Sequence, residues 1–245
     1  LFRSLPRYWR VSVVEVTGST QDDLFQLSSH PNPDIRVQSG EVLVAEFQSK
    51  GRGRLDRSFS AAHGSALTFS LFYSPRRDRE DWSYLTLLAG LSVVKALNSF
   101  DEKVKVTIKW PNDLLINNLK VSGMLAQAHE YGVVLGIGIN VGMQEDELPL
   151  PSATSLALQN FAELDRNKLL SSIINKISQE LEIWESGSHS LEEYLTYSAT
   201  LGQAVAVTLP DGSVINADAV GITQLGELQL SNGSVISVGD VVHLR

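Results

Sequence analysis

The sequence predicts an α+β protein in which a main domain of helices and strands is followed by a small β-rich appendix. Two segments carry apolar residues at helical spacing, one before residue 100 and one after residue 165. Between them, four β-rich runs follow one another closely, and after Gly202 short alternating strands are separated by turn sequences. A chain of 245 residues suits one large domain, or one large and one small domain.

The N-terminal part is expected to hold strands on either side of a short helix. Val11–Val16 and Glu41–Ala45 are β-branched runs typical of strands. Ser19 followed three residues later by Asp22 is typical of a helix N-cap and its partner, so a helix is predicted to begin there. Ala66–Tyr73 predicts a further strand.

The middle of the chain predicts a helix followed by an antiparallel meander. Apolar residues recur at helical spacing through Asp81–Phe100, which predicts a long core helix. Tight turns are expected at Asn117-Asn118 and Tyr131-Gly132. The four predicted strands are Val104–Trp110, Asp113–Ile116, Lys120–Gln127 and Val133–Val141.

The C-terminal part predicts two helices and then a small barrel. Apolar residues from Leu169 to Trp184 form one stripe of an amphipathic helix, and Ser190 with Glu193 predicts a capping box that opens a short helix near Tyr194. Strands such as Val205–Leu209 then alternate with Gly-containing turns. We place the domains at residues 1–198 and 199–245, and expect the small one to dock on the large one.

Composition excludes several classes of protein. The 43% hydrophobic content excludes a disordered chain, and the absence of cysteine excludes a thiolate zinc site and a thiol nucleophile. The net charge of −8 argues against a nucleic-acid partner, because phosphate binding needs clustered Lys and Arg. No apolar run approaches the ~20 residues that span a bilayer, and the first residues do not resemble a signal peptide. We therefore expect a cytoplasmic protein that does not bind membranes.

A basic, glycine-containing stretch is the clearest candidate for a binding loop. It starts at Gln48 and places Lys50, Arg52, Arg54 and Arg57 against a single acid, Asp56. The glycines between the cations allow the backbone to fold around an anion while the guanidinium groups contact it, which predicts a phosphate or carboxylate site. A solvated basic surface loop is the alternative, and the spacing excludes a P-loop.

A second candidate is Lys109-Trp110-Pro111-Asn112-Asp113, with Lys120 and Gly123 further on. Pro111 interrupts the strand, so Asn112 and Asp113 can face a cleft, where Asp113 could hold Mg²⁺ on a polyphosphate. The alternatives are a turn that caps its own backbone, a core role for Trp110 and an exposed Lys120.

The third candidate is Gly136-Ile137-Gly138-Ile139-Asn140. It resembles the start of a dinucleotide fingerprint, but Asn140 stands near the third glycine position and no helical pattern follows, which excludes a Rossmann site. Small residues in a strand instead predict the close approach of a ligand. The five histidines lack metal-ligand spacing, and no Gly-x-Ser-x-Gly elbow is present.

Taken in order, these motifs and Gly18-Ser19-Thr20-Gln21 resemble the biotin protein ligases across nearly the whole chain. The resemblance implies a class II synthetase-like α+β domain with an SH3-like C-terminal barrel. It implies that biotin and MgATP give biotinyl-5′-AMP and pyrophosphate, after which a lysine of a biotin carboxyl carrier domain of a biotin-dependent carboxylase displaces AMP.

The resemblance also assigns roles to individual residues. Arg52 and Lys120 are the implied catalytic groups, Asp113 the magnesium ligand, and the loop from Gly51 to Arg57 is expected to be mobile when empty. The implied biotin-binding residues are Ser19, Thr20, Gln21, Gln48, Arg52, Gly53, Arg54, Lys120, Gly123 and Gly136. The implied nucleotide-binding residues are Arg54, Arg57, Lys109, Trp110, Asn112 and Asn140.

Two departures from the family pattern stand out. Many relatives continue Arg-Gly-Arg-x-Trp where this chain has Leu55-Asp56-Arg57-Ser58-Phe59, so we expect a difference in how tightly the intermediate is held. Relatives that also repress transcription carry a preceding helix-turn-helix module, whereas Ser19 stands near the start of this sequence, so we expect a ligase that is not a repressor.

The sequence also suits three alternative interpretations. A lipoate–protein ligase is disfavoured because its Arg-x-Ser-Gly-Gly-Gly stretch is absent. A non-catalytic biotin-sensing module is the alternative from another class. A homodimer formed through an exposed sheet edge is possible.

Overall fold

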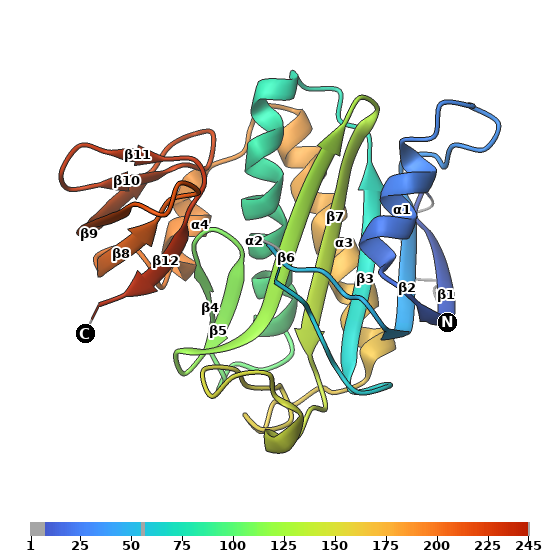
Figure 1. Ribbon diagram of the computed structural model, residues 1–245, viewed down its shortest axis with the longest axis horizontal. Coiled ribbons are helices and arrows are strands. Elements are labelled where there is room, and N and C mark those ends of the chain that lie inside the picture. The colour runs from blue at the N-terminus through green and yellow to red at the C-terminus, as the bar shows by residue number, and fades with distance from the viewer. Residues whose placement is uncertain (1–7, 55–56, 245) are drawn as a thin grey trace.

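A computed structural model describes residues 8–54 and 57–244 of the chain, so Leu55 and Asp56 lie outside the described residues. The architecture is α+β, as predicted, with a seven-stranded mixed sheet in the main domain and a five-stranded antiparallel sheet at the C-terminal end (Figure 1). The strand orders are β1-β2-β3-β7-β6-β5-β4 and β11-β10-β9-β8-β12.

The main sheet contains one parallel pair, β1 with β2, and its other neighbouring strands are antiparallel. The predicted meander is confirmed, because β4, β5, β6 and β7 pair in sequence order. The strands are β1 Arg10–Thr17, β2 Glu41–Gln48, β3 Ala66–Tyr73, β4 Val106–Lys109, β5 Asp113–Ile116, β6 Leu119–His129 and β7 Gly132–Asn140.

Helix α1, Thr20–Ser28, connects the parallel strands and lies across one face of the sheet, against β2, β3 and β7 (Figure 1). The predicted N-cap is confirmed, because Ser19 Oγ accepts a hydrogen bond from the Asp22 backbone N–H at 3.4 Å. This cap fixes the start of the helix immediately after β1, so the first turn of α1 stands over the middle of the sheet.

Helices α2, Leu85–Asn98, and α3, Arg166–Glu185, pack against each other on the opposite face (Figure 1). The helix predicted from Asp81 begins four residues later, because the segment before it is a 3₁₀ helix, η1, Arg79–Tyr84. The indole of Trp82 donates back to Arg77 O at 3.0 Å, a local bond that apolar spacing does not reveal.

Strand β4 is also shorter than predicted at both ends. Asp101 Oδ1 accepts from the backbone N–H groups of Lys103 and Val104, at 2.8 and 3.2 Å, so these residues form a turn and the strand begins at Val106. At the other end the strand stops at Lys109, which leaves Trp110 outside the ladder.

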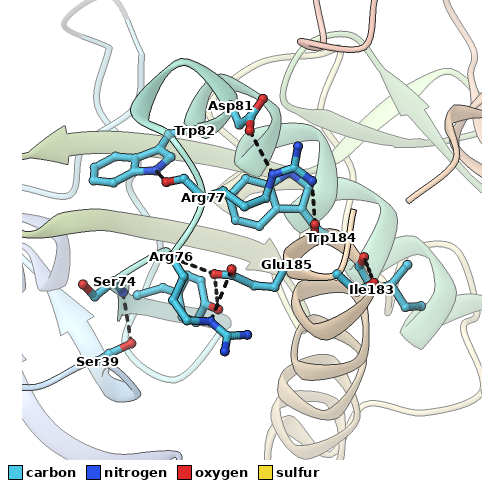
Figure 2. A network of polar contacts seen from close by, with 11 residues as sticks. Ser39, Ser74, Arg76, Arg77, Asp81, Trp82, Ile183, Trp184 and Glu185 are labelled. Atoms are coloured by element: carbon cyan, nitrogen blue, oxygen red, sulfur yellow. Dashed lines mark hydrogen bonds and ion pairs between the residues drawn. The ribbon is translucent and has the colours of Figure 1, made fainter. Parts of the chain in front are cut away.

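The C-terminal end of α3 is held to the chain that follows β3. The side chain of Glu185 is buried, and its carboxylate accepts from Tyr73 Oη at 2.8 Å and from the Arg76 backbone N–H at 3.0 Å (Figure 2). The Arg77 guanidinium bridges Asp81 and the carbonyl of Trp184. Burial raises the pKa of Tyr73, and the Glu185 carboxylate raises it further, so the hydroxyl of Tyr73 remains a donor.

The predicted short helix is α4, Leu191–Tyr197, but its cap differs from the predicted capping box. Ser190 Oγ accepts from the Glu192 N–H at 3.1 Å, while the Glu193 carboxylate pairs with Lys95 on α2 at 2.8 Å. The side chain expected to complete the box therefore ties α4 to the core helix instead.

The predicted β-rich C-terminal domain is confirmed, and it docks on the main domain at Trp110, directly after β4, and at η1. The Trp110 indole donates to Gly226 O at 2.9 Å, and Ser83 Oγ donates to Leu225 O at 2.8 Å. The strands of this domain are β8 Ala204–Thr208, β9 Val214–Ile222, β10 Leu228–Leu230, β11 Val235–Ile236 and β12 Asp240–His243.

No helix within the described ranges is long and apolar enough to cross a membrane.

Candidate functional site

A cavity of about 1020 Å³ opens between the start of α1, the sheet, the basic glycine loop and β12 of the C-terminal domain. It brings together every site residue proposed from the sequence except Trp110. The predicted residues that line it are Ser19, Thr20, Gln21, Gln48, Arg52, Gly53, Arg54, Arg57, Lys109, Asn112, Asp113, Lys120, Gly123, Gly136 and Asn140.

Strands β6 and β7 form the floor of the cavity, because their residues at alternate positions face it. Gly123 pairs with Gly138, and Leu125 pairs with Gly136, so three glycines lie side by side on the face that turns towards α1. A Cβ at Gly136 would lie 2.5 Å from Gln21 Oε1, and one at Gly138 would lie 2.7 Å from the Phe59 ring. The absence of side chains at Gly136 and Gly138 thus lets the Gln21 amide and the Phe59 ring approach the sheet closely, and both residues line the cavity.

A group of hydroxyls and amides forms the α1 end of the cavity. Gln48 Oε1 accepts from the Thr20 backbone N–H at 2.7 Å, and Thr20 Oγ1 lies 2.9 Å from Ser70 Oγ. Ser70 Oγ in turn donates to Gln21 Oε1 at 3.2 Å. These bonds hold several donors and acceptors in place before any ligand arrives, which suits recognition of a small polar ring.

Gln21 is fixed from its other end as well. Its Nε2 donates to Gln127 Oε1 at 3.0 Å and to Val134 O at 3.1 Å. Sequence reasoning missed Ser70, although two hydroxyl residues at alternate positions of an apolar strand, Thr68 and Ser70 in Ala66–Tyr73, were an available signal. Its position opposite Gly136 places it in the pocket.

Cations line the opposite part of the cavity, and three of them are already paired with carboxylates from other elements. Arg52 Nη1 lies 2.6 Å from Asp22 Oδ1 of α1, and Lys120 Nζ lies 2.6 Å from Asp113 Oδ1 of β5. Arg57 pairs with Asp240 of β12. An anionic ligand must therefore share these groups with carboxylates or displace the carboxylates.

Arg54 is held differently, by an amide. Its Nη1 donates to Asn112 Oδ1 at 2.9 Å, and Asn112 Nδ2 donates to Met124 O at 2.9 Å, so the amide is locked on the sheet. Burial lowers the pKa of Arg54, against the raising effects of Asp113 and Asp240. The guanidinium stays charged but partly desolvated, which strengthens its attraction for an anion.

The Lys120 ammonium depends on a neighbouring glycine for its position. A Cβ at Gly123 would lie 3.2 Å from Lys120 Nζ, so the absence of a side chain there lets the ammonium lie across the floor. Asp113 pairs with Gly123 in the β5–β6 ladder, which brings the carboxylate to the same place.

Trp110 is the one predicted site residue that the structure does not bring to the cavity. It is 2% exposed, its backbone N–H donates to Thr200 Oγ1, and its indole donates to Gly226 O. Its neighbours in the motif face the cavity because the backbone bends at Pro111, whereas the indole anchors the C-terminal domain. The alternative interpretation of Trp110 as a core residue is the one that the structure supports.

The part of the cavity around Asn140 also includes residues that sequence reasoning did not single out. Asn140 Nδ2 donates to Thr154 O at 2.8 Å, and the residues of the 149–153 segment lie beside it. Strand β12 contributes its edge, including His243. No motif marked these segments, because they reach the cavity only through long-range packing.

The donor set suits a hard cation more than zinc. Within residues 8–54 and 57–244 no group of three or more His, Asp or Glu side chains could enclose a metal. Two carboxylates line the cavity, and Asp240 is paired with Arg57, whereas Asp113 lies beside Lys120, a cation that suits phosphate. Mg²⁺ bound to a polyphosphate usually needs one or two protein carboxylates and keeps several waters, so these residues fit that ion.

The sequence of the chain is similar to those of known proteins over nearly its whole length. The biotin/lipoate A/B protein ligase family model matches residues 13–144, and the biotin protein ligase C terminal domain model matches residues 200–244. A biotin--[acetyl-CoA-carboxylase] ligase from Mycobacterium tuberculosis is 35% identical, over 97% of this chain and 90% of that protein. The bifunctional ligase/repressor BirA of Escherichia coli is 28% identical, over 96% of this chain and 74% of that protein.

The fold of the chain is also similar to that of a solved structure. A biotin protein ligase from Aquifex aeolicus in complex with biotin and ATP superposes with a TM-score of 0.78 at 29% identity. That match covers 96% of this chain and 99% of the Aquifex chain, so it includes both domains.

Proposed function

The chain belongs to the biotin/lipoate A/B protein ligase family, and we propose that it is a biotin–protein ligase. It activates biotin with ATP to biotinyl-5′-AMP and transfers the biotin to a lysine of a biotin carboxyl carrier domain. The family includes lipoate ligases, and the match of residues 200–244 to the biotin protein ligase C terminal domain favours biotin. The observation that carries the proposal is one cavity with a polar, amide-lined end and a cationic end.

Biotin is expected to enter with its ureido ring at the α1 end. The ring presents N–H donors and a carbonyl acceptor, which match the hydroxyl and amide groups of Thr20, Gln48 and Ser70. Its aliphatic tail would then lie over the glycine floor, near Leu125. This placement directs the carboxylate towards Arg52 and Lys120.

The first chemical step joins two anions, and the cations lower its cost. A biotin carboxylate oxygen attacks the α-phosphorus, a C–O–P anhydride forms, and the bond to the β-phosphate breaks to release pyrophosphate. Two unit charges ~4 Å apart repel by several kcal/mol in a partly dry site. Arg52 and Lys120 offset that repulsion and stabilise the charge that grows on the phosphoryl oxygens.

The nucleotide is expected on the other side of these cations. Arg54, positioned by Asn112, would contact the phosphate, while Lys109, Arg57 and Asn140 line the space for the rest of the nucleotide. Asp113 would hold Mg²⁺, which when bound neutralises phosphate charge. Lys120 then acts as a counter-charge to both Asp113 and the phosphate.

The second step transfers biotin to the carrier. The lysine amine attacks the carbonyl carbon of the adenylate, a C–N bond forms, the bond to AMP breaks, and the amine loses a proton. No side chain of the ligase needs to form a covalent intermediate, which agrees with the absence of cysteine. A cytoplasmic location is part of the same proposal, since a chain without cysteine has no need of an oxidising compartment.

The test is direct biotinylation of a carrier. Purified protein, biotin, MgATP and a candidate carrier domain are mixed, and the carrier is weighed by mass spectrometry. The proposal predicts the mass gain of one biotin amide, absent when ATP is omitted or when the target lysine of the carrier is replaced by arginine. A protein that binds biotin but leaves several carriers unmodified would be a sensing module rather than a ligase.

A further inference from the structure

Asp22 is one of the residues on α1 that no motif assigned to a role in ligand binding. As part of the predicted cap it was expected to support the helix start, and its backbone N–H does so. Its carboxylate turns away from the cap and accepts from Arg52 Nη1 at 2.6 Å. Arg52 lines the cavity, whereas Asp22 lies just outside its wall, directly after Ser19, Thr20 and Gln21.

Asp22 is paired with Arg52, which is the cation expected to bind the biotin carboxylate. Both side chains are about half exposed, 42% for Arg52 and 49% for Asp22, so the pair is accessible to water and weak enough to exchange. An incoming carboxylate at Arg52 meets the Asp22 carboxylate as a neighbour of the same charge. Binding therefore requires either that Arg52 leaves Asp22 or that two anions share one guanidinium, and both cost free energy.

We propose that Asp22 is a positioning residue that holds Arg52 in the empty site and competes with the biotin carboxylate for it. The proposal rests on the proposed function, because it takes the carboxylate of biotin as the competing anion. In this account Asp22 lowers biotin affinity, and the ligand gains Arg52 only by exchanging one carboxylate partner for another. The geometry assigns this role to Asp22 and not to Asp23, whose carboxylate accepts from Thr17 Oγ1 instead.

Asp23 supplies a matched control. Asp22→Asn and Asp23→Asn remove the same charge from the same first turn of α1, so both lose the same favourable interaction with the helix N-terminus. Both change the long-range field in the cavity to a similar degree. Only the first variant removes the carboxylate that is paired with Arg52.

The first measurement needs no biotin. Ligand-free protein is treated with phenylglyoxal, and modification of Arg52 is followed by peptide mass spectrometry. The proposal predicts faster modification of Arg52 in Asp22→Asn than in the parent, and an unchanged rate in Asp23→Asn. Equal rates in all three proteins would overturn it, whether or not the protein binds biotin.

The second measurement is the dissociation constant for biotin by calorimetry. Asp22→Asn should bind biotin about 1.4- to 5-fold more tightly than Asp23→Asn, the range expected when an exposed ion pair no longer has to be broken. Weaker binding by Asp22→Asn would show that Asp22 orients Arg52 for the ligand, and would contradict competition. If none of the proteins bound biotin, the proposed function would fail, while the modification rates would still decide whether Asp22 restrains Arg52.

Discussion

Lys120 Nζ lies 2.6 Å from Asp113 Oδ1, so the cation expected to bind phosphate and the carboxylate expected to bind magnesium occupy one place. The β5–β6 ladder brings them together, because Asp113 pairs with Gly123 and the missing side chain of Gly123 leaves room for the ammonium. In the proposed reaction, ATP and its metal would arrive between two groups that already neutralise each other. Neither Lys120 nor Asp113 is therefore an unpaired charge when the site is empty.

Replacing Lys120 by alanine should slow formation of the adenylate by roughly 10²–10³-fold, because one group that stabilises the transferring phosphoryl charge is lost. Biotin-dependent exchange of labelled pyrophosphate into ATP measures this step. Lys168→Ala is the control, since Lys168 pairs with Glu163 at the start of α3, and it should retain full activity. Parent-like exchange by Lys120→Ala would show that Lys120 is not catalytic.

Replacing Arg52 by alanine should weaken biotin binding by roughly tenfold or more. This is the lower end of the range for a hydrogen bond to a charged group, about 1.5–3 kcal/mol, chosen because Arg52 is partly exposed to water. Calorimetry on the apo protein measures it. Arg10→Ala removes a cation of the edge strand β1 that pairs with Glu41 of β2, and it should leave the affinity unchanged. A similar loss in both variants would argue against a specific role for Arg52.

Replacing Trp110 by phenylalanine should lower the free energy of unfolding by about 1–3 kcal/mol, because Gly226 O loses its donor in a buried interface. Urea denaturation measures the change. Trp82→Phe removes an indole bond to Arg77 O at a partly exposed site, where water can replace the donor, so its loss should be smaller. Equal losses would mean that the indole does not anchor the C-terminal domain.

Stability should fall as the pH drops through the range in which histidine titrates. His129 is buried among Phe25, Phe72 and Tyr131, and its Nδ1 accepts from the Tyr131 N–H, so the proton belongs on Nε2, which faces Ser28 Oγ. Burial lowers the pKa of His129 below its ordinary 6.5, and the positive charges of Arg79 and Arg36 lower it further.

The unfolded chain therefore takes up a proton before the folded one does. The stabilisation is complete above about pH 6.5 and is lost as the pH falls from there towards the lower folded pKa. His129→Asn keeps an acceptor near the Nδ1 position but does not titrate, so its urea midpoint should depend less on pH between about 8 and 5 than that of the parent. An unchanged slope would place the pH dependence in His189 or His243, whose pKa values are also lowered by burial.

Local signals in the sequence were enough to predict most of the fold. Apolar periodicity reports which face of an element is buried, and it located the stripe of α3 and the four strands of the meander. Where local bonds override periodicity, the boundaries were wrong, as at Trp82 before α2 and at Asp101 before β4.

The candidate site was predictable in its composition but not in its pairing. Glycines between cations, and alternating glycines in a strand, indicate backbone approach whatever the fold, so the loop and the floor were found. The partners of the cations were not, because Asp240 lies 183 residues from Arg57 and only the docked C-terminal domain brings them together. Trp110 was misassigned because its place in a polar motif does not say which way a bend turns its ring.

In the proposed reaction, the polar end of the cavity and its cations together make an acyl-adenylate from biotin. This step is measured by exchange of labelled pyrophosphate into ATP, with biotin or lipoate as the only added acid. We expect exchange with biotin and none with lipoate. Exchange with lipoate alone, or no exchange with either acid, would show that this cavity does not activate biotin.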